Sequence, residues 1–261
     1  MTPPTTSTAA GVPYVLVPPA TVRPDAPVVL AWHLMDAPCT ERAFAAALPL
    51  DGLDAWRVYL GLPMTGTRPP GVAELQRRGM DDAVLRIYGP VAEQALAEVG
   101  PVLRELRPTV GDGPLALVGG SMGAAVAQLV AAEGGLDVAA VVLVSPLVQL
   151  RPLIDAAATT HGFSYAWTAA SDAVAARLDF VARAGELLAP VLAVVGSEDA
   201  EAFRTSAAAL VAGLGRAELI TVDGMGHALA AEPGLEPAPQ TPHAAEVDAH
   251  AVAWLRRHLD R

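Results

Sequence analysis

The stretch that decides the fold runs from residue 115 to residue 123 and reads Leu-Ala-Leu-Val-Gly-Gly-Ser-Met-Gly. Its first four residues are apolar, and an Ala-rich run over Met122–Glu133 follows the glycines. The pattern predicts a buried strand, a tight turn and a buried helix. A sharp strand-to-helix turn tolerates only small neighbours. Gly119 and Gly123 therefore fit a turn on which Ser121 holds its hydroxyl away from the backbone.

Short apolar, β-branched runs recur along the rest of the chain, and helix-like stretches fall between most of them. The predicted strands are Val28–Trp32, Ala55–Leu60, Leu115–Val118, Val138–Val144, Val191–Val195 and Ala217–Val222, with Tyr14–Val17 as a possible edge strand. The predicted helices are Thr40–Leu48, Pro90–Arg107, Met122–Glu133, Ala200–Leu214 and His243–Leu259. Nearly continuous apolar strands alternating with helices predict an α/β fold, with a mostly parallel central sheet covered by helices on both faces.

The length of 261 residues and the 52% hydrophobic content suit one large domain. We expect this domain to cover residues 13–261, after a disordered tail over residues 1–12. Residues 147–188 interrupt the rhythm of strands and helices, which predicts a short cap insertion. Two Pro/Gly-rich stretches, Gly61–Gly79 and Glu232–Pro242, are predicted to be surface loops.

Composition excludes several kinds of chemistry. The chain has no Lys, which excludes a lysine Schiff base and a Walker A lysine, and Cys39 is its only cysteine. One cysteine closes no intramolecular disulfide and builds no thiolate metal cluster. The net charge of −11 opposes binding to nucleic acid or to an anionic membrane. The first residues, MTPPTTSTAAG, do not resemble a secretion signal, so we expect a cytoplasmic protein.

The G-x-S-x-G pattern at residues 119–123 resembles the nucleophile elbow of the α/β-hydrolase superfamily, in particular of small bacterial carboxylesterases. A phosphate-binding turn is the alternative, but the chain lacks both the G-x-G-x-x-G pattern at this turn and the lysine of a Walker motif. The resemblance implies a catalytic triad in the order serine, acid, histidine, with each residue on a loop after a strand. Asp199 and His227 occupy such loops. Glu198 and Glu201 are alternative acids, and Asp199 could instead cap the helix that follows it.

The resemblance also implies an oxyanion hole of two backbone N–H groups. Met122 would supply the first, at the start of a helix whose dipole favours negative charge. The second would come from the loop after Val28–Trp32, where Met35 is the expected donor and Leu34 the alternative. The superfamily commonly has Gly at the position of Leu34. We expect His33 to have a structural role in this loop.

The substrate pocket is less well defined by the sequence. Leu34, Met64, Phe163, Tyr165 and Trp167 are candidates to line an apolar cleft. The alternative for the three aromatic residues is that they hold the cap on the sheet. A metal site at His243, Glu246 and His250 is rejected because their spacing does not suggest a closed set of ligands, so neither a metal nor an organic cofactor is expected.

These observations together predict a serine hydrolase that cleaves carboxylic esters of small or medium acyl substrates. The alternatives are an amide, lactone or thioester hydrolase, or an acyltransferase, on the same machinery. A non-catalytic, hydrolase-like ligand-binding module is a further alternative. The expected partner is a small-molecule ester, not nucleic acid or a membrane, and the sequence does not define an oligomeric state.

Overall fold

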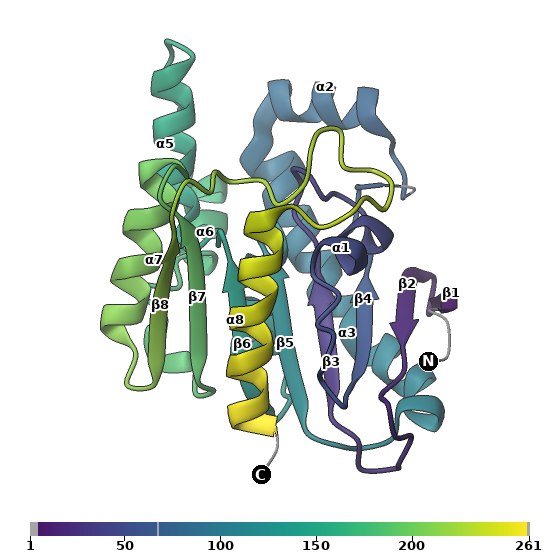
Figure 1. Ribbon diagram of the computed structural model, residues 1–261. Coiled ribbons are helices and arrows are strands. Elements are labelled where there is room, and N and C mark those ends of the chain that lie inside the picture. The colour runs from purple at the N-terminus through teal and green to yellow at the C-terminus, as the bar shows by residue number, and fades with distance from the viewer. Residues whose placement is uncertain (1–4, 67, 260–261) are drawn as a thin grey trace.

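The computed structural model describes residues 5–66 and 68–259 and contains an eight-stranded sheet in the order β1-β2-β4-β3-β5-β6-β7-β8 (Figure 1). Strand β2 pairs antiparallel with both β1 and β4, and all the other neighbours are parallel. The strands are β1 (Thr5–Ala9), β2 (Val12–Val17), β3 (Val28–Trp32), β4 (Trp56–Leu60), β5 (Leu115–Gly120), β6 (Val138–Val144), β7 (Val191–Gly196) and β8 (Ala217–Val222). The predicted α/β class with a mostly parallel sheet is confirmed.

Helices cover both faces of this sheet, as Figure 1 shows. The helices are α1 (Glu41–Ala47), α2 (Val72–Ala83), η1 (Val84–Tyr88), α3 (Gly89–Val110), α4 (Met122–Glu133), α5 (Leu150–Thr160), α6 (Ala169–Arg177), η2 (Ala184–Glu186), α7 (Glu201–Gly213) and α8 (Pro242–Leu259). Side chains of α3, α4 and α7 share one buried cluster with the sheet, and those of α1 and α8 share the other. None of the helices in the described part of the chain combines the length and apolar character that a membrane span requires.

The N-terminal residues correct one expectation. Residues 5–9, predicted to belong to a disordered tail over residues 1–12, form strand β1, and residues 1–4 lie outside the described residues. The sequence TTSTA has no apolar pattern, and the strand is held by main-chain pairing with β2. As a result the possible edge strand at Tyr14–Val17 becomes an inner strand, β2, between β1 and β4.

A second correction concerns the stretch Gly61–Gly79, which was predicted to be a surface loop. Its second half belongs to α2, which begins after a Pro-Pro-Gly sequence at residues 69–71. The helix is polar and rich in charged residues that pair along its surface, such as Glu74 with Arg77 and Arg78. Such ion pairs support a solvent-exposed helix without the apolar periodicity that made the other helices predictable.

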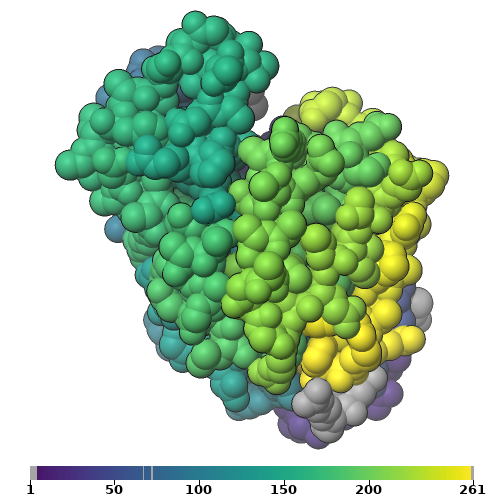
Figure 2. All heavy atoms as spheres, turned by 90° about the vertical axis from the view of Figure 1, so that its left-hand side faces the viewer, coloured from purple at the N-terminus to yellow at the C-terminus, as the bar shows by residue number. Residues whose placement is uncertain are grey.

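Between β6 and β7 the chain leaves the sheet and forms α5, α6 and η2, the segment that was predicted to be a cap insertion. Helices α5 and α2 rise beyond the end of the sheet, above the carboxyl ends of its parallel strands (Figure 1). The view turned by 90° shows α5 as part of a projection with an indentation beside it (Figure 2). Loops that follow the parallel strands therefore lie next to this projection.

The turn between β5 and α4 depends on unusually close backbone packing. Ser121 has φ 47°, in the left-handed region that side chains other than glycine rarely adopt. A Cβ atom on Gly119 would lie 2.2 Å from the carbonyl oxygen of Gly123, and one on Gly123 would lie 2.3 Å from that of Trp32. The two glycines of the G-x-S-x-G pattern are therefore required by the distance between main chains, as the sequence predicted.

Replacing Gly123 tests this packing. Gly123→Ala should lower the free energy of unfolding by roughly 1–3 kcal/mol, because the new methyl group would force β3 and α4 apart. The matched control is Gly185→Ala, since a Cβ there would meet nothing within 4 Å. The control should stay within about 0.5 kcal/mol of the parent protein in urea unfolding. Equal stability of the two variants would contradict this account.

Candidate active site

Three side chains from loops after β5, β7 and β8 meet at the carboxyl edge of the sheet. His227 Nε2 lies 2.9 Å from the hydroxyl oxygen of Ser121. On the other side of the imidazole, Nδ1 lies 3.0 Å from both carboxylate oxygens of Asp199. The structure thus brings Ser121, His227 and Asp199 into one chain of hydrogen bonds, although the serine and the histidine are 106 residues apart in sequence.

Asp199 is fixed from several directions. Its carboxylate is fully buried and accepts a hydrogen bond of 2.7 Å from the backbone N–H of Ala200. Arg204 donates through Nε to the backbone carbonyl of Asp199. The residue therefore binds the start of the following helix as well as the histidine. A carboxylate that accepts from Nδ1–H leaves the lone pair of Nε2 directed to the hydroxyl of Ser121.

The loops that carry the acid and the histidine are also tied to each other. The backbone N–H of Glu198 donates to the carbonyl of Met225, and the hydroxyl of Ser197 accepts from the N–H of Gly224. Phe203 of α7 stacks on the imidazole of His227, with ring centroids 4.1 Å apart and planes inclined by 38°. These contacts restrict the rotation of the imidazole ring.

His33 holds the loop after β3 without contacting this chain of hydrogen bonds. It is buried, its Nδ1–H donates to the carbonyl of Leu34, and its Nε2 accepts from the backbone N–H of Leu62. Burial lowers the pKa of His33 from 6.5 to about 4, so its imidazole is neutral at pH 7. The loop that contains Met35 is thereby fastened to the loop after β4.

A pocket of about 270 Å³ opens beside Ser121. Its lining is mostly apolar or aromatic, and the residues are Met35, Asp36, Tyr88, Ser121, Met122, Leu147, Leu153, Phe203 and His227. Both residues predicted as oxyanion-hole donors, Met35 and Met122, belong to this lining. A larger hollow of about 540 Å³ surrounds Arg57, but it contains none of the residues of the Ser–His–Asp chain.

The predicted pocket residues are not among this lining, which corrects the sequence-based assignment. Leu34 is fully buried and packs under Gly120, where a Cβ atom would lie 2.4 Å from the leucine Cδ1. Met64 lines a separate hollow with Glu74 and the arginines of α2. The loop after β3 thus turns Leu34 into the core and Met35 toward Ser121.

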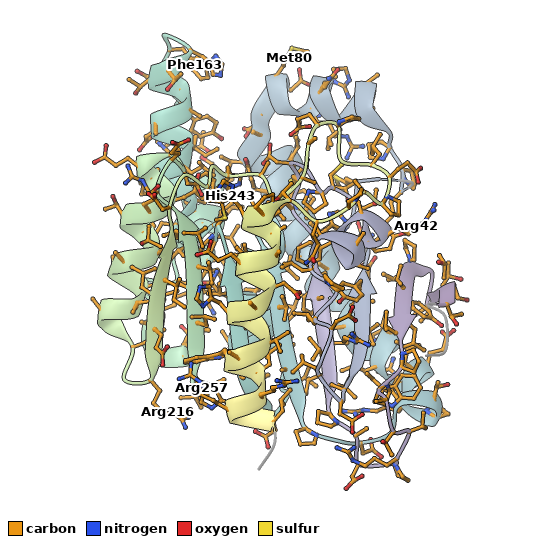
Figure 3. The ribbon with its side chains drawn as sticks, in the orientation of Figure 1. Arg42, Met80, Phe163, Arg216, His243 and Arg257 are labelled. Atoms are coloured by element: carbon orange, nitrogen blue, oxygen red, sulfur yellow. The ribbon has the colours of Figure 1, made fainter. Side chains whose placement is uncertain are left out.

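The three aromatic residues of the insertion hold its parts together. Tyr165 and Trp167 pack edge to face, and their polar atoms donate to Asp82 and Asp155, respectively. Phe163 is 57% exposed and lies at the outer end of the projection (Figure 3). The alternative role for these residues, packing within the cap, therefore agrees with the structure.

Sequence reasoning missed the residues that line the pocket in their place. Tyr88 and Leu153 come from η1 and α5, whose positions depend on tertiary packing. Phe203 had a local signal, because it lies four residues after Asp199 on the helix that this acid precedes. Asp36 directly follows Met35, and its Oδ2 lies 3.6 Å from His227 Nε2.

Metal ligation has no candidate in the described ranges: within residues 5–66 and 68–259 no group of three His, Cys, Asp or Glu side chains could hold a metal ion. The single cysteine, Cys39, is a free thiol that contacts the carbonyls of Pro233 and Gly234.

Comparison with known proteins identifies the fold. No family model matches the sequence, and no curated protein sequence matches it significantly. Among solved structures, TT1662 from Thermus thermophilus is similar over 100% of both chains, with a TM-score of 0.69 and 21% identity. Est1E from Butyrivibrio proteoclasticus is similar over 99% of both chains, with a TM-score of 0.67 and 14% identity.

A dienelactone hydrolase from Anabaena variabilis is similar over 98% of this chain and 99% of its own, with a TM-score of 0.59 and 18% identity. Together with the strand order and the sharp turn at Ser121, these similarities show that the chain has the α/β-hydrolase fold. The resemblance found in the sequence is thus confirmed as a common fold.

The buried imidazole of His33 predicts a specific dependence of stability on pH. The folded protein binds this proton only near pH 4, whereas the unfolded chain binds it near 6.5, so stability is complete above pH 6.5 and is lost as the pH falls toward 4. The loss from His33 should total roughly 3 kcal/mol. In His33→Gln the free energy of unfolding should therefore fall less steeply over this range.

Urea unfolding of both proteins between pH 7 and about pH 4 measures this difference. Burial also raises the pKa of Asp248, to about 6, which has the opposite effect on stability. Because Asp248 is present in both proteins, its contribution cancels in the comparison. Identical pH profiles would show that His33 is not the buried neutral base described above.

Proposed function

We propose that this protein is a serine hydrolase that cleaves carboxylic esters of small or medium acyl groups. The observation that supports the proposal most is the 2.9 Å separation between Ser121 Oγ and His227 Nε2, with Asp199 on Nδ1 of the same ring. A serine hydroxyl becomes a nucleophile when a neighbouring base removes its proton, and a carboxylate on the far nitrogen orients that base.

In the proposed reaction Ser121 attacks the ester carbonyl while His227 Nε2 takes the hydroxyl proton. The tetrahedral intermediate collapses, the imidazolium gives this proton to the departing alcohol, and an acyl-enzyme forms on Ser121. Water then attacks the acyl carbonyl with the same imidazole as base, which releases the acid and restores the serine. The carboxylate of Asp199 holds the ring and stabilises its protonated form.

The developing oxyanion requires nearby N–H donors. We assign them to the backbone of Met122 and Met35, which line the pocket beside Ser121 from the start of α4 and from the loop after β3. The first turn of a helix carries N–H groups without intrahelical acceptors and a partial positive charge, so α4 favours an anion at this point. His33 keeps the second donor loop in place.

Two further observations favour a small ester as substrate. The pocket volume of about 270 Å³ suits small or medium acyl groups. Est1E is an esterase by its name, and another similar structure is an esterase domain from Rhodothermus marinus, although their low identity carries only the fold. Hydrolysis should decline in acid, since a protonated His227 cannot accept the serine proton.

Covalent labelling tests the nucleophile. A fluorophosphonate probe should label the parent protein but not Ser121→Ala, and this variant should lose ester hydrolysis by a thousandfold or more, on the order seen for other triad serines. Ser145→Ala is the matched control. Ser145 also has a positive φ, 42°, at the end of a neighbouring strand, but its buried hydroxyl has no partner.

The Ser145→Ala variant should keep both labelling and activity. Labelling that persists in Ser121→Ala, or an active parent protein that the probe never modifies, would refute the assignment of Ser121. A folded parent protein without any Ser121-dependent hydrolysis would favour the non-catalytic binding module.

The acid is tested by Asp199→Asn. The amide can keep the bond to the N–H of Ala200, so the fold should persist, but an amide NH₂ facing Nδ1 favours the tautomer with a proton on Nε2. Turnover of an ester should fall by about 10³- to 10⁴-fold. Glu198→Gln and Glu201→Gln are the controls, and both should retain nearly full activity. A large loss in either control would identify a different acid.

A further inference from the structure

One charged side chain of the pocket has no function in the mechanism above. Asp36 is the only carboxylate in the pocket lining apart from the Ser–His–Asp chain, and its side chain is 57% exposed. It forms no ion pair with an arginine in the described part of the chain, and its nearest charged or titratable contact is Nε2 of His227, at 3.6 Å. No arginine contributes to the lining.

The position of this carboxylate relates it to one part of the substrate. Nε2 of His227 gives its proton to the departing alcohol, so the alcohol oxygen must come within hydrogen-bonding reach of Nε2. A carboxylate oxygen 3.6 Å from the same nitrogen therefore lies on the alcohol side of the scissile bond. A negative charge there repels an alcohol group that carries a carboxylate and attracts one that carries a cation.

The neighbouring side chains also suit a cation. Tyr88 and Phe203 bring two aromatic rings to the pocket, and aromatic faces attract organic cations such as quaternary ammonium groups. The Tyr88 hydroxyl makes no hydrogen bond within the described residues. Burial and the charge of Asp36 raise the pKa of Tyr88 to about 12, so this ring stays neutral. The rest of the lining is mainly Leu and Met, which suits the alkyl groups around a cationic nitrogen.

We propose that the site selects esters whose alcohol part carries a cationic nitrogen, and that Asp36 is the residue that determines this preference. The inference rests on the proposed ester hydrolysis. In the tetrahedral intermediate the substrate cation would also lie near the oxyanion. It would therefore offset the repulsion between this oxyanion and the Asp36 carboxylate.

A matched pair of substrates isolates the charge. Acetylcholine and 3,3-dimethylbutyl acetate have nearly the same shape, but a neutral tert-butyl group replaces the trimethylammonium group in the second. The parent protein should have the higher kcat/KM for acetylcholine. In Asp36→Asn the ratio of the two kcat/KM values should fall about three- to tenfold, as expected for one partly exposed ion pair next to aromatic rings.

Asp25→Asn is the control because it removes one negative charge before β3, at the opposite end of that strand from Asp36, from a side chain that is 84% exposed. This variant should keep the ratio of the parent protein. Added salt should lower the preference of the parent for acetylcholine, because ions screen an exposed charge pair, and it should change Asp36→Asn much less.

Each outcome decides between defined possibilities. If Asp36 only stabilised the protonated imidazole, Asp36→Asn would slow both esters equally, and the unchanged ratio would overturn the inference. Failure to prefer the cationic ester in the parent protein would overturn it as well. Ser121-dependent cleavage of p-nitrophenyl acetate without cleavage of either matched ester would overturn the inference alone, whereas no Ser121-dependent cleavage of any ester would overturn the proposed function too.

Discussion

The candidate site depends on the close approach of main chains around Ser121. The first turn of α4 lies so near to β3 and β5 that a Cβ atom on Gly119 or Gly123 would come within about 2.3 Å of a carbonyl oxygen. This packing, together with the bond from the Ser121 N–H to the carbonyl of Val144, holds the serine at φ 47°. The hydroxyl is therefore directed out of the sheet edge, beside the N-terminus of a helix that favours negative charge.

The sheet topology completes the arrangement. Because β5, β6, β7 and β8 are parallel neighbours, the loops after them share one edge, and contacts between the β7 and β8 loops fix Asp199 relative to His227. The insertion after β6 and helix α2 rise above the same edge. The pocket therefore combines residues from early and late parts of the chain, including Asp36, whose negative charge distinguishes it from a purely apolar cleft.

The sequence predicted those parts of the molecule that local chemistry specifies. Apolar strands such as Val138–Val144 and the Ala-rich α4 agree residue for residue with the prediction, since each is buried along its length. Ser121, Asp199 and His227 were recognisable because each follows a predicted strand. Strand β1 escaped because its polar residues are held by main-chain pairing, and α2 because ion pairs support it. The pocket lining was predicted poorly, since it depends on how η1, α5 and α7 pack over the sheet edge.

The central claim is that Ser121 carries the acyl group during turnover. The most direct test mixes the protein rapidly with p-nitrophenyl acetate, stops the reaction in acid within the first turnover and locates any acetyl group by peptide mass spectrometry. The account predicts a burst of p-nitrophenol of up to one equivalent per protein, with the acetyl group on the hydroxyl of Ser121. Sustained hydrolysis with no acetylated peptide, or with the acetyl group on another residue, would contradict it.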